Sequence, residues 1–262
     1  MSEVQGRSPG TMSNERRYGI AISVALILGG LYWALTGLSD GEKSSADNYP
    51  VQGDALVIKN GSAELEIRAG DGPDMHVERQ FERTALGHDP KEKYGDGKLE
   101  LNSGGCGFLW FGCKTSYVLT VPKDLRLTIE SSSGDVNLSG MPAGATIKAS
   151  SGSIEVHDAG GPLTLESSSG DIDADGLTAT SVTTKSSSGS VALDFTVAPQ
   201  SVDSKSSSGD VSIRIPSGDE SYQVDTKTSS GEESANVKVD PSSTRTLHAK
   251  TSSGDVTIEY NH

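Results

Sequence analysis

Apolar and polar residues alternate along the chain from residue 124 to residue 260, and the alternation is organised around a recurring Ser-Ser-Gly phrase. The phrase returns seven times, and its glycines lie 18 to 23 residues apart. These glycines are Gly134, Gly152, Gly170, Gly189, Gly209, Gly231 and Gly254. Self-similarity at such a period is typical of a stacked repeat protein, in which each unit buries its apolar face against its neighbours.

Each repeat is predicted to hold two short strands, one on either side of the glycine. Apolar residues stand at odd offsets before the glycine, as at Leu127, and at even offsets after it, as at Val136 and Leu138. Because a straight strand cannot change phase in this way, the chain must bend at the glycine. The pattern predicts an all-β fold, a β-helix-like solenoid with two strands per coil of 18–23 residues and about 4.8 Å between coils.

The two serines before each glycine form columns that run from Ser132 to Ser252 and from Ser133 to Ser253. Alternation predicts that one column faces inward and the other outward, with hydroxyl groups that bond along the stack. A glycosylated or ligand-binding edge is the alternative. In the sixth repeat Glu233 takes a position that is apolar elsewhere, which predicts the weakest packing of the rod there.

Residues 53–123 are predicted to form an irregular β part that caps one end of the regular repeats at 124–260. Residues 56–67 read as a degenerate first copy of the repeat, whereas the charged segment 87–98 is predicted as a surface loop. Solenoids need such caps because an open sheet edge can pair with another chain.

The segment from Tyr18 to Leu38 is apolar and carries no charge over its twenty-one residues, enough to cross a bilayer as a helix. Arg16 and Arg17 precede it, so the positive-inside bias predicts a cytoplasmic tail at 1–17 and a transmembrane helix at 18–38. Polar residues 39–52 are predicted as a linker to an extracellular domain. The chain is therefore expected to be a single-pass plasma-membrane protein. A cleaved signal peptide is the rival, but its apolar region is usually shorter.

The charge of the chain narrows the class of partner. Its formal net charge is −14, with 33% hydrophobic and 5% aromatic residues. Nucleic acid as a partner is excluded, because it requires a basic patch. Cationic peptides and metal ions are the partners that such a surface favours.

Cys106 and Cys113 enclose a short aromatic segment. A nearby cysteine pair outside the membrane predicts a disulfide that closes a small loop. Its apolar residues are Phe108, Leu109, Trp110 and Phe111. Two interpretations stand: the loop covers the apolar end of the solenoid, or it is exposed and contacts a partner or the bilayer surface.

Candidate chemistry in the repeats is sparse. Asp135, Asp171, Asp210 and Asp255 follow the glycine, so calcium is considered, but turn stabilisation is favoured because the column is interrupted. A column of lysines with Glu130 and Glu166 stands four residues before the glycine and is interpreted as protection against aggregation. No nucleophile, acid–base pair or cofactor motif is recognised, so the prediction is no enzyme, no catalytic residue and no cofactor.

The iterated Ser-Ser-Gly-Asp-Val/Ile phrase, preceded by Val118-Leu119-Thr120-Val121-Pro122, resembles a bacterial family of β-strand-repeat domains labelled "putative adhesin" or domain of unknown function. The start at 56–62 also fits, so the resemblance covers residues 53–260. It implies an extracytoplasmic, membrane-anchored repeat domain and no catalytic residues.

The expected function is a non-enzymatic binding or adhesion module at the bacterial cell envelope, with an envelope polymer or surface protein as partner. One alternative is an envelope-stress or signalling component that binds cationic peptides. A polysaccharide-active enzyme is a third. Ligand identity and oligomeric state are left open.

Overall fold

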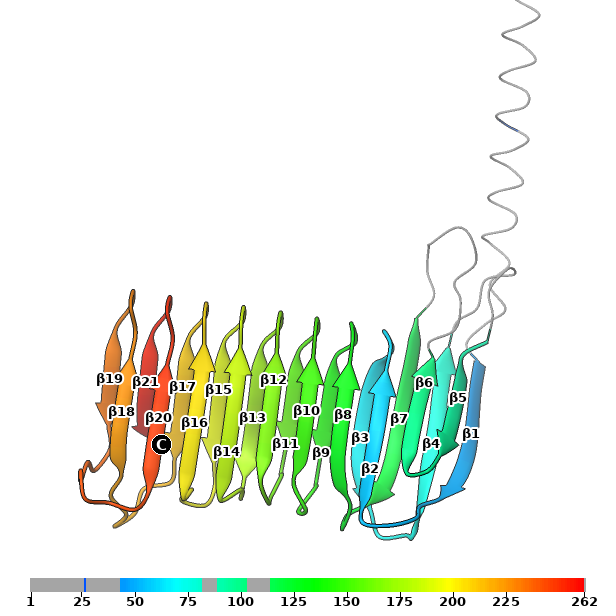
Figure 1. Ribbon diagram of the computed structural model, residues 1–262, viewed down its shortest axis with the longest axis horizontal. Coiled ribbons are helices and arrows are strands. Elements are labelled where there is room, and N and C mark those ends of the chain that lie inside the picture. Colours follow the sequence, from blue (N-terminus) through cyan, green and yellow to red (C-terminus); the bar gives the residue numbers. More distant parts are fainter. Residues whose placement is uncertain (1–25, 27–42, 82–88, 103–113, 262) are drawn as a thin grey trace, which may run out of the picture.

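The computed structural model describes residues 26, 43–81, 89–102 and 114–261, and residues 43–261 of these form a rod of two facing β-sheets (Figure 1). Sheet A has 11 strands in the order β1-β4-β7-β3-β9-β11-β13-β15-β17-β21-β19. Sheet B has 10 strands in the order β18-β20-β16-β14-β12-β10-β8-β2-β6-β5. Within the described ranges, no helix is long and apolar enough to span a membrane.

The strands are short, as the alternation predicts. Those of sheet A are β1 (Lys43–Pro50), β3 (Glu64–Gly70), β4 (Asp74–Phe81), β7 (Thr115–Pro122), β9 (Val136–Ser139), β11 (Ile154–His157), β13 (Ile172–Leu177), β15 (Val191–Phe195), β17 (Val211–Ile215), β19 (Glu233–Asn236) and β21 (Val256–Tyr260). Those of sheet B are β2 (Ala55–Asn60), β5 (Lys91–Gly95), β6 (Lys98–Asn102), β8 (Arg126–Ser131), β10 (Ala145–Ala149), β12 (Leu163–Ser167), β14 (Ser181–Ser186), β16 (Ser201–Ser206), β18 (Gln223–Lys227) and β20 (Thr246–Lys250).

One strand of sheet B, the turn after it and one strand of sheet A make a rung, and rungs stack in parallel. Leu127 on β8 pairs with Ala145 on β10, and Val136 on β9 pairs with Ile154 on β11. Equivalent repeat positions therefore lie side by side in straight columns, which confirms the solenoid expected from the sequence.

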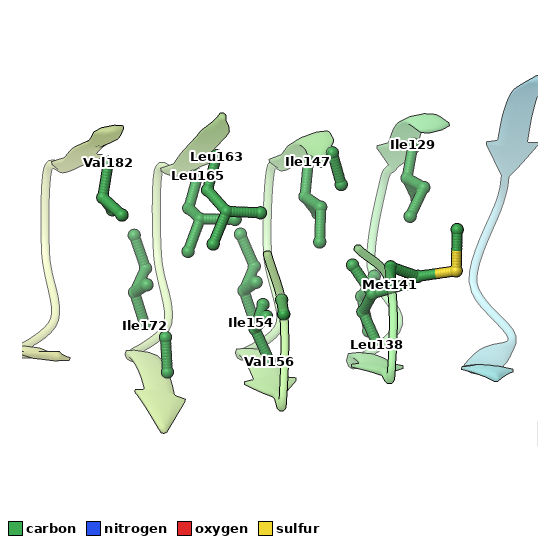
Figure 2. Packing of buried hydrophobic residues seen from close by; sticks show 14 of the residues in the cluster. Ile129, Leu138, Met141, Ile147, Ile154, Val156, Leu163, Leu165, Ile172 and Val182 are labelled. Atoms are coloured by element: carbon green, nitrogen blue, oxygen red, sulfur yellow. The ribbon is translucent and has the colours of Figure 1, made fainter. Parts of the chain in front are cut away.

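The apolar columns of the two sheets face each other and form one continuous core (Figure 2). Ile129 and Ile147 from sheet B lie opposite Leu138 and Ile154 from sheet A, and all four have no exposed surface. Alternate residues on each strand point to solvent, so buried and exposed side chains alternate along the strand.

The Ser-Ser-Gly turns bend the chain from sheet B to sheet A. Gly209 has a φ of 128°, and a β-carbon added there would lie 2.4 Å from the carbonyl oxygen of Gly189 on the neighbouring rung. Only glycine fits both the backbone conformation and this close approach.

The predicted split of the serine columns is wrong. Ser132 and Ser133 are both exposed, and the buried position is Ser131, three residues before the glycine. The turn reverses the chain at once, so the next two side chains both stay outside. The inward hydroxyls contact turn carbonyls: Ser206 Oγ donates to Gly189 O at 3.1 Å, and Thr251 Oγ1 donates to Gly209 O at 2.9 Å.

The order of rungs in space departs from the order in sequence at both ends. The β20–β21 rung lies between β16–β17 and β18–β19, so the sixth repeat forms the outer end (Figure 1). Glu233 on β19 pairs with Val256 in the expected register and is exposed, as are Ala235 and Val239. The weak packing expected at the sixth repeat is thus present, because this rung has a neighbour on one side only.

At the other end, the β2–β3 rung lies between β6–β7 and β8–β9, with Leu56 paired to Leu127 and Leu65 to Val136. This agrees with a degenerate first copy of the repeat. The antiparallel strands β1, β4 and β5 then cover the end.

Two sequence interpretations are corrected here. Residues 43–50, assigned to the 39–52 linker, form β1 because they pair along the whole of β4. Residues 91–95, assigned to a surface loop, form β5 on the edge of sheet B.

Several predictions fall outside the described residues. They are the transmembrane helix at 18–38, of which Leu26 alone is described, the Cys106–Cys113 disulfide and the aromatic segment from Phe108 to Phe111.

Candidate binding groove on sheet B

A groove runs along sheet B beside the Ser-Ser-Gly turns. One wall is the column of side chains four residues before each turn glycine, and the other is the first exposed serine of each turn. We call this feature the serine groove. It consists of two hollows of about 570 Å³ and 350 Å³, and Lys185 belongs to both.

The serine wall repeats once per rung. Its members are Ser132, Ser150, Ser168, Ser187, Ser207, Ser252 and Ser229, in spatial order. All seven are exposed. Since a hydroxyl both donates and accepts, this wall offers a regular line of hydrogen-bonding groups about 4.8 Å apart.

The opposite wall is a charged column whose sign pattern changes along the rod. From the N-terminal end, it reads Lys93, Glu100, Lys59, Glu130, Lys148, Glu166, Lys185, Lys205, Lys250 and Lys227. Charges alternate strictly as far as Glu166, and four lysines follow. We call the lining from Lys59 to Glu166 the ladder half of the groove. We call the lining from Lys185 to Lys227 the lysine half.

Within the ladder half, opposite charges neutralise each other. Lys59 Nζ lies 2.9 Å from Glu130 Oε2, and Lys148 Nζ lies 3.3 Å from Glu166 Oε2. The hydrogen bond from Lys59 lowers the pKa of Glu130, and the same bond raises the pKa of Lys59. These pairs are half exposed and contribute little to stability, but they leave no net charge for a ligand.

The lysine half is arranged differently. Lys205 contacts Asp203 on its own strand at 2.7 Å, and Lys250 contacts Asp225 on the neighbouring strand at 2.6 Å. Among the described residues, Lys185 and Lys227 form no ion pair. Positive charge is therefore in excess along the lysine half of the groove, although the net charge of the whole chain is −14.

The floor of the groove is the buried column three residues before the glycine. Two of its polar atoms, Asn60 Oδ1 and Ser186 Oγ, are buried without a hydrogen-bond partner in the described part of the chain. Asn60 does donate from Nδ2 to Ala63 O at 2.7 Å and to Ser131 Oγ at 3.1 Å. The floor is thus mostly bonded within the protein, which keeps the walls in fixed positions.

The outer face of sheet A carries acidic side chains on β11 and β13, in contrast to the lysines of the groove. Asp173 and Asp175 lie outward on β13, next to Glu155 and His157 on β11. His157 Nδ1 lies 3.0 Å from both carboxylate oxygens of Asp175, and this hydrogen bond raises the pKa of the imidazole.

The aspartates after the turn glycines accept hydrogen bonds from backbone amides of the neighbouring rung. Asp135 Oδ1 accepts from Ser153 N at 2.8 Å, and Asp171 Oδ1 accepts from Ser190 N at 2.8 Å. Asp210 and Asp255 repeat this contact one rung further along. In the described ranges, no cluster of three acidic, His or Cys side chains is arranged to hold a metal ion.

From the sequence, a ligand-binding edge at the serine columns is only an alternative, and the groove is not predicted. The serine and lysine columns were both recognised in the sequence, but the bend at the glycine decides that they flank one hollow. The alternation of charge was hidden because Lys59 and Glu100 lie outside the regular repeats. The unbroken run of four lysines depends on the position of β20 between β16 and β18.

Residues 54–261 match the family model Toastrack DUF4097. No curated protein matches the chain. Among solved structures, a "putative adhesin" from Parabacteroides distasonis ATCC 8503 is 15% identical, with 85% of this chain and 98% of that chain covered at a TM-score of 0.50. A "putative cell adhesion protein" from Clostridium sporogenes ATCC 15579 is 12% identical, with 84% and 100% covered at a TM-score of 0.40. A "putative lipid binding protein" from Parabacteroides distasonis ATCC 8503 is 14% identical, with 86% and 98% covered at 0.44. At these identities the likeness is one of fold.

Proposed function

We propose, from the premise that the chain belongs to the Toastrack DUF4097 family, that it is a non-enzymatic binding module that holds an extended polymer in the serine groove. The observation that carries this proposal is the repetition of the lining: each rung from β8 to β18 adds one exposed serine and one charged side chain at the strand spacing. A straight array of equivalent groups matches a ligand that is itself a repeating chain.

Repetition also supports a binding role over a catalytic one. Catalysis needs a particular acid, base or nucleophile set apart by its surroundings. The groove offers the same hydroxyl and charged groups at successive rungs, so no one rung is distinguished as a reaction centre. The serine hydroxyls lie close to the backbone of a rigid sheet and lose little freedom when a ligand binds, which favours affinity.

The place of action is part of the proposal. The apolar segment 18–38, with Arg16 and Arg17 before it, supports an anchor in the plasma membrane with the rod outside the cell. A rod displayed there would meet envelope polymers and the surfaces of other cells.

The test uses the full chain in detergent, immobilised and exposed to purified envelope polymers. Ser207→Trp fills the groove, and Ser208→Trp is the matched control, because Ser208 is exposed in the same turn but does not line the groove. We expect retention of a polymer to fall at least tenfold for S207W and to stay unchanged for S208W. Equal retention by all variants would exclude the groove as the binding surface.

A second candidate function, capture of cationic peptides, is favoured by the acidic outer face of sheet A. Asp173, Asp175 and Glu155 lie together there with Asp171 in the adjoining turn. Binding of a cationic peptide should weaken in Asp173→Asn and disappear at high salt, since attraction between exposed charges is screened. It should be unaffected by S207W.

A further inference from the structure

The lysine half of the serine groove repeats one cationic group per rung over four successive rungs. Lys185 pairs with Lys205, Lys205 with Lys250, and Lys250 with Lys227. Neighbouring strands lie about 4.8 Å apart, so the first and last of these residues are separated by about 14 Å at the backbone. The register of the sheet fixes this spacing.

We propose that this half of the groove binds a linear polyanion, namely an acidic polysaccharide whose negative charges repeat along its length. The inference rests on the proposed function and specifies its ligand. The ammonium groups in this row repel one another. A chain of anions lying along the row would relieve that repulsion at every rung.

Two of the four lysines, Lys205 and Lys250, form ion pairs with aspartates, and these aspartates do not close the site. Asp203 and Asp225 lie six residues before their turn glycines, on the side of the lysine column away from the serine wall, and neither lines the groove. Exposed ion pairs of this kind are weak, so the ammonium groups of Lys205 and Lys250 can turn to a polyvalent ligand. Lys185 and Lys227, at the two ends of the row, have no ion-pair partner within the described chain and provide the excess charge.

The lining selects among polyanions. It consists of lysine, serine and threonine side chains and contains no aromatic residue. Single-stranded nucleic acids rely on aromatic side chains for base stacking, which this surface does not supply. The wall of Ser187, Ser207, Ser252 and Ser229 can instead exchange hydrogen bonds with hydroxyl groups. A chain that carries both hydroxyls and carboxylates fits this combination.

The ladder half provides the internal control. Its serine wall is the same, but Glu130 and Glu166 alternate with the lysines there. A polyanion lying along that half would meet a repulsive carboxylate at every second rung. The structure therefore confines the anionic ligand to the rungs from β14 to β18.

The experiment measures binding of the full chain in detergent to fluorescent polygalacturonate, with inorganic polyphosphate and neutral dextran as the other probes. The test variant K185Q/K227Q removes the two unpaired lysines. The control variant K114Q/K123Q removes two ion-paired lysines that lie outside the groove, so both variants change the net charge by the same amount. Thermal unfolding of each variant checks that the fold is retained.

We expect polygalacturonate to bind the wild-type chain and to bind at least tenfold more weakly to K185Q/K227Q. Its affinity should change less than threefold for K114Q/K123Q. The slope of log affinity against log salt should also become shallower for K185Q/K227Q, because fewer counterions are displaced. Equal weakening in both double variants would overturn the proposal in favour of a general charge effect.

The remaining outcomes separate this inference from the proposed function. Binding of dextran that is lost in S207W and insensitive to the lysines would overturn the polyanion while leaving the groove as the binding surface. Polyphosphate bound more tightly than polygalacturonate, with the same lysine dependence, would support the polyanion site and overturn its assignment to a polysaccharide. Binding of no polymer by the wild-type chain would overturn both proposals.

Discussion

Gly209 lies so close to Gly189 on the neighbouring rung that a β-carbon on Gly209 would stand 2.4 Å from the Gly189 carbonyl oxygen. The same relationship joins Gly170 to Gly152 and Gly189 to Gly170. The turn edge of the rod is therefore a continuous stack of backbone, and the space for a side chain is absent at each step.

Replacing Gly209 by alanine should destabilise the rod by about 3 kcal/mol or more, because both the positive φ and the backbone contact oppose a side chain. Gly53→Ala is the control: its φ is 89°, but a β-carbon there meets nothing within 4 Å, so the cost should be only about 1–2 kcal/mol. Chemical denaturation of both variants gives the comparison. Equal losses would show that conformation alone, and not the stacking of turns, demands glycine.

The buried hydroxyl column predicts unequal effects of one substitution. Ser206 Oγ donates to Gly189 O, whereas the equivalent Ser186 Oγ is buried without a partner in the described chain. Ser206→Ala should cost about 1 kcal/mol, and Ser186→Ala should be neutral or slightly stabilising. Ala149 already occupies this column in the natural chain. A larger loss for Ser186→Ala, again measured by denaturation, would contradict this account.

Arg79 and Glu92 join the two sheets at the N-terminal end. Arg79 Nη1 donates to both carboxylate oxygens of Glu92, whose side chain is only 4% exposed, and Arg79 Nη2 donates to Ser45 Oγ at 2.8 Å. Glu92→Gln should destabilise by about 2–3 kcal/mol, because it leaves a partly buried guanidinium without its main counterion.

Glu100→Gln is the control for this ion pair. It breaks the exposed Lys98–Glu100 pair and should leave the free energy of unfolding almost unchanged. Hydrogen exchange of the β4 and β5 amides should report the loss in Glu92→Gln locally. If the two variants unfold alike, the buried pair has no special role.

His157 should make stability depend on pH. Asp175 chiefly, with Glu155 and Asp173, raises the pKa of the His157 imidazole in the folded rod above its unfolded value of about 6.5. The protonated form therefore stabilises the fold fully below that value, and this contribution is lost as pH rises through the folded pKa.

Asp175→Asn should return the pKa of His157 toward its ordinary value and remove this part of the pH dependence. Asp203→Asn removes the same charge from the other sheet and should leave it unchanged. An NMR titration of the imidazole between pH 5 and 9 measures the effect. Identical titration curves for the wild type and D175N would refute the assignment.

The displaced order of the last two rungs predicts that their removal has unequal effects. Among the described strands, β18 pairs with β20 alone and β19 with β21 alone. A chain that stops after residue 245 should therefore leave residues 217–245 open to protease, since that rung has lost its neighbour.

Deleting residues 218–242 should instead leave a folded rod. Five residues would then join β17 to β20, as five join β15 to β16, and β20 and β21 would keep their contacts with β16 and β17. Limited proteolysis with mass spectrometry compares the two chains. Protection of β18 and β19 in the truncated chain would disprove the order of assembly inferred here.

Much of this fold is predictable from the sequence because each column of the rod repeats one local rule. Alternation locates the strands, and the recurring glycine locates the bend. The sequence predictions are wrong where the structure depends on residues that are distant in the sequence. β1 and β5 have no apolar alternation of their own and become strands through pairing with β4 and β6. The burial of Ser131 rather than one of the next two serines depends on how sharply the turn reverses.

The candidate site was less predictable for a related reason. The columns that line the serine groove are visible in the sequence, but their neighbours are set by rung order. Lys59 is seventy-one residues from Glu130 in the chain and is paired with it in the rod. Lys250 follows Lys227 in sequence but lies before it in space. The sign pattern along the groove, and with it the lysine half, emerges only from this order.

The displaced rungs at both ends also bear on how such a rod can change its length during evolution. Between β8 and β17, successive repeats are neighbours in space. A duplicated or deleted repeat there would displace the rest of the rod but would keep the same kind of strand pairing between neighbouring rungs. At the ends the chain doubles back, and a copy added after β21 would begin between two rungs that are already in place. Duplication in the middle of the repeats is therefore favoured, and it would lengthen the groove while the rungs at both ends keep their order.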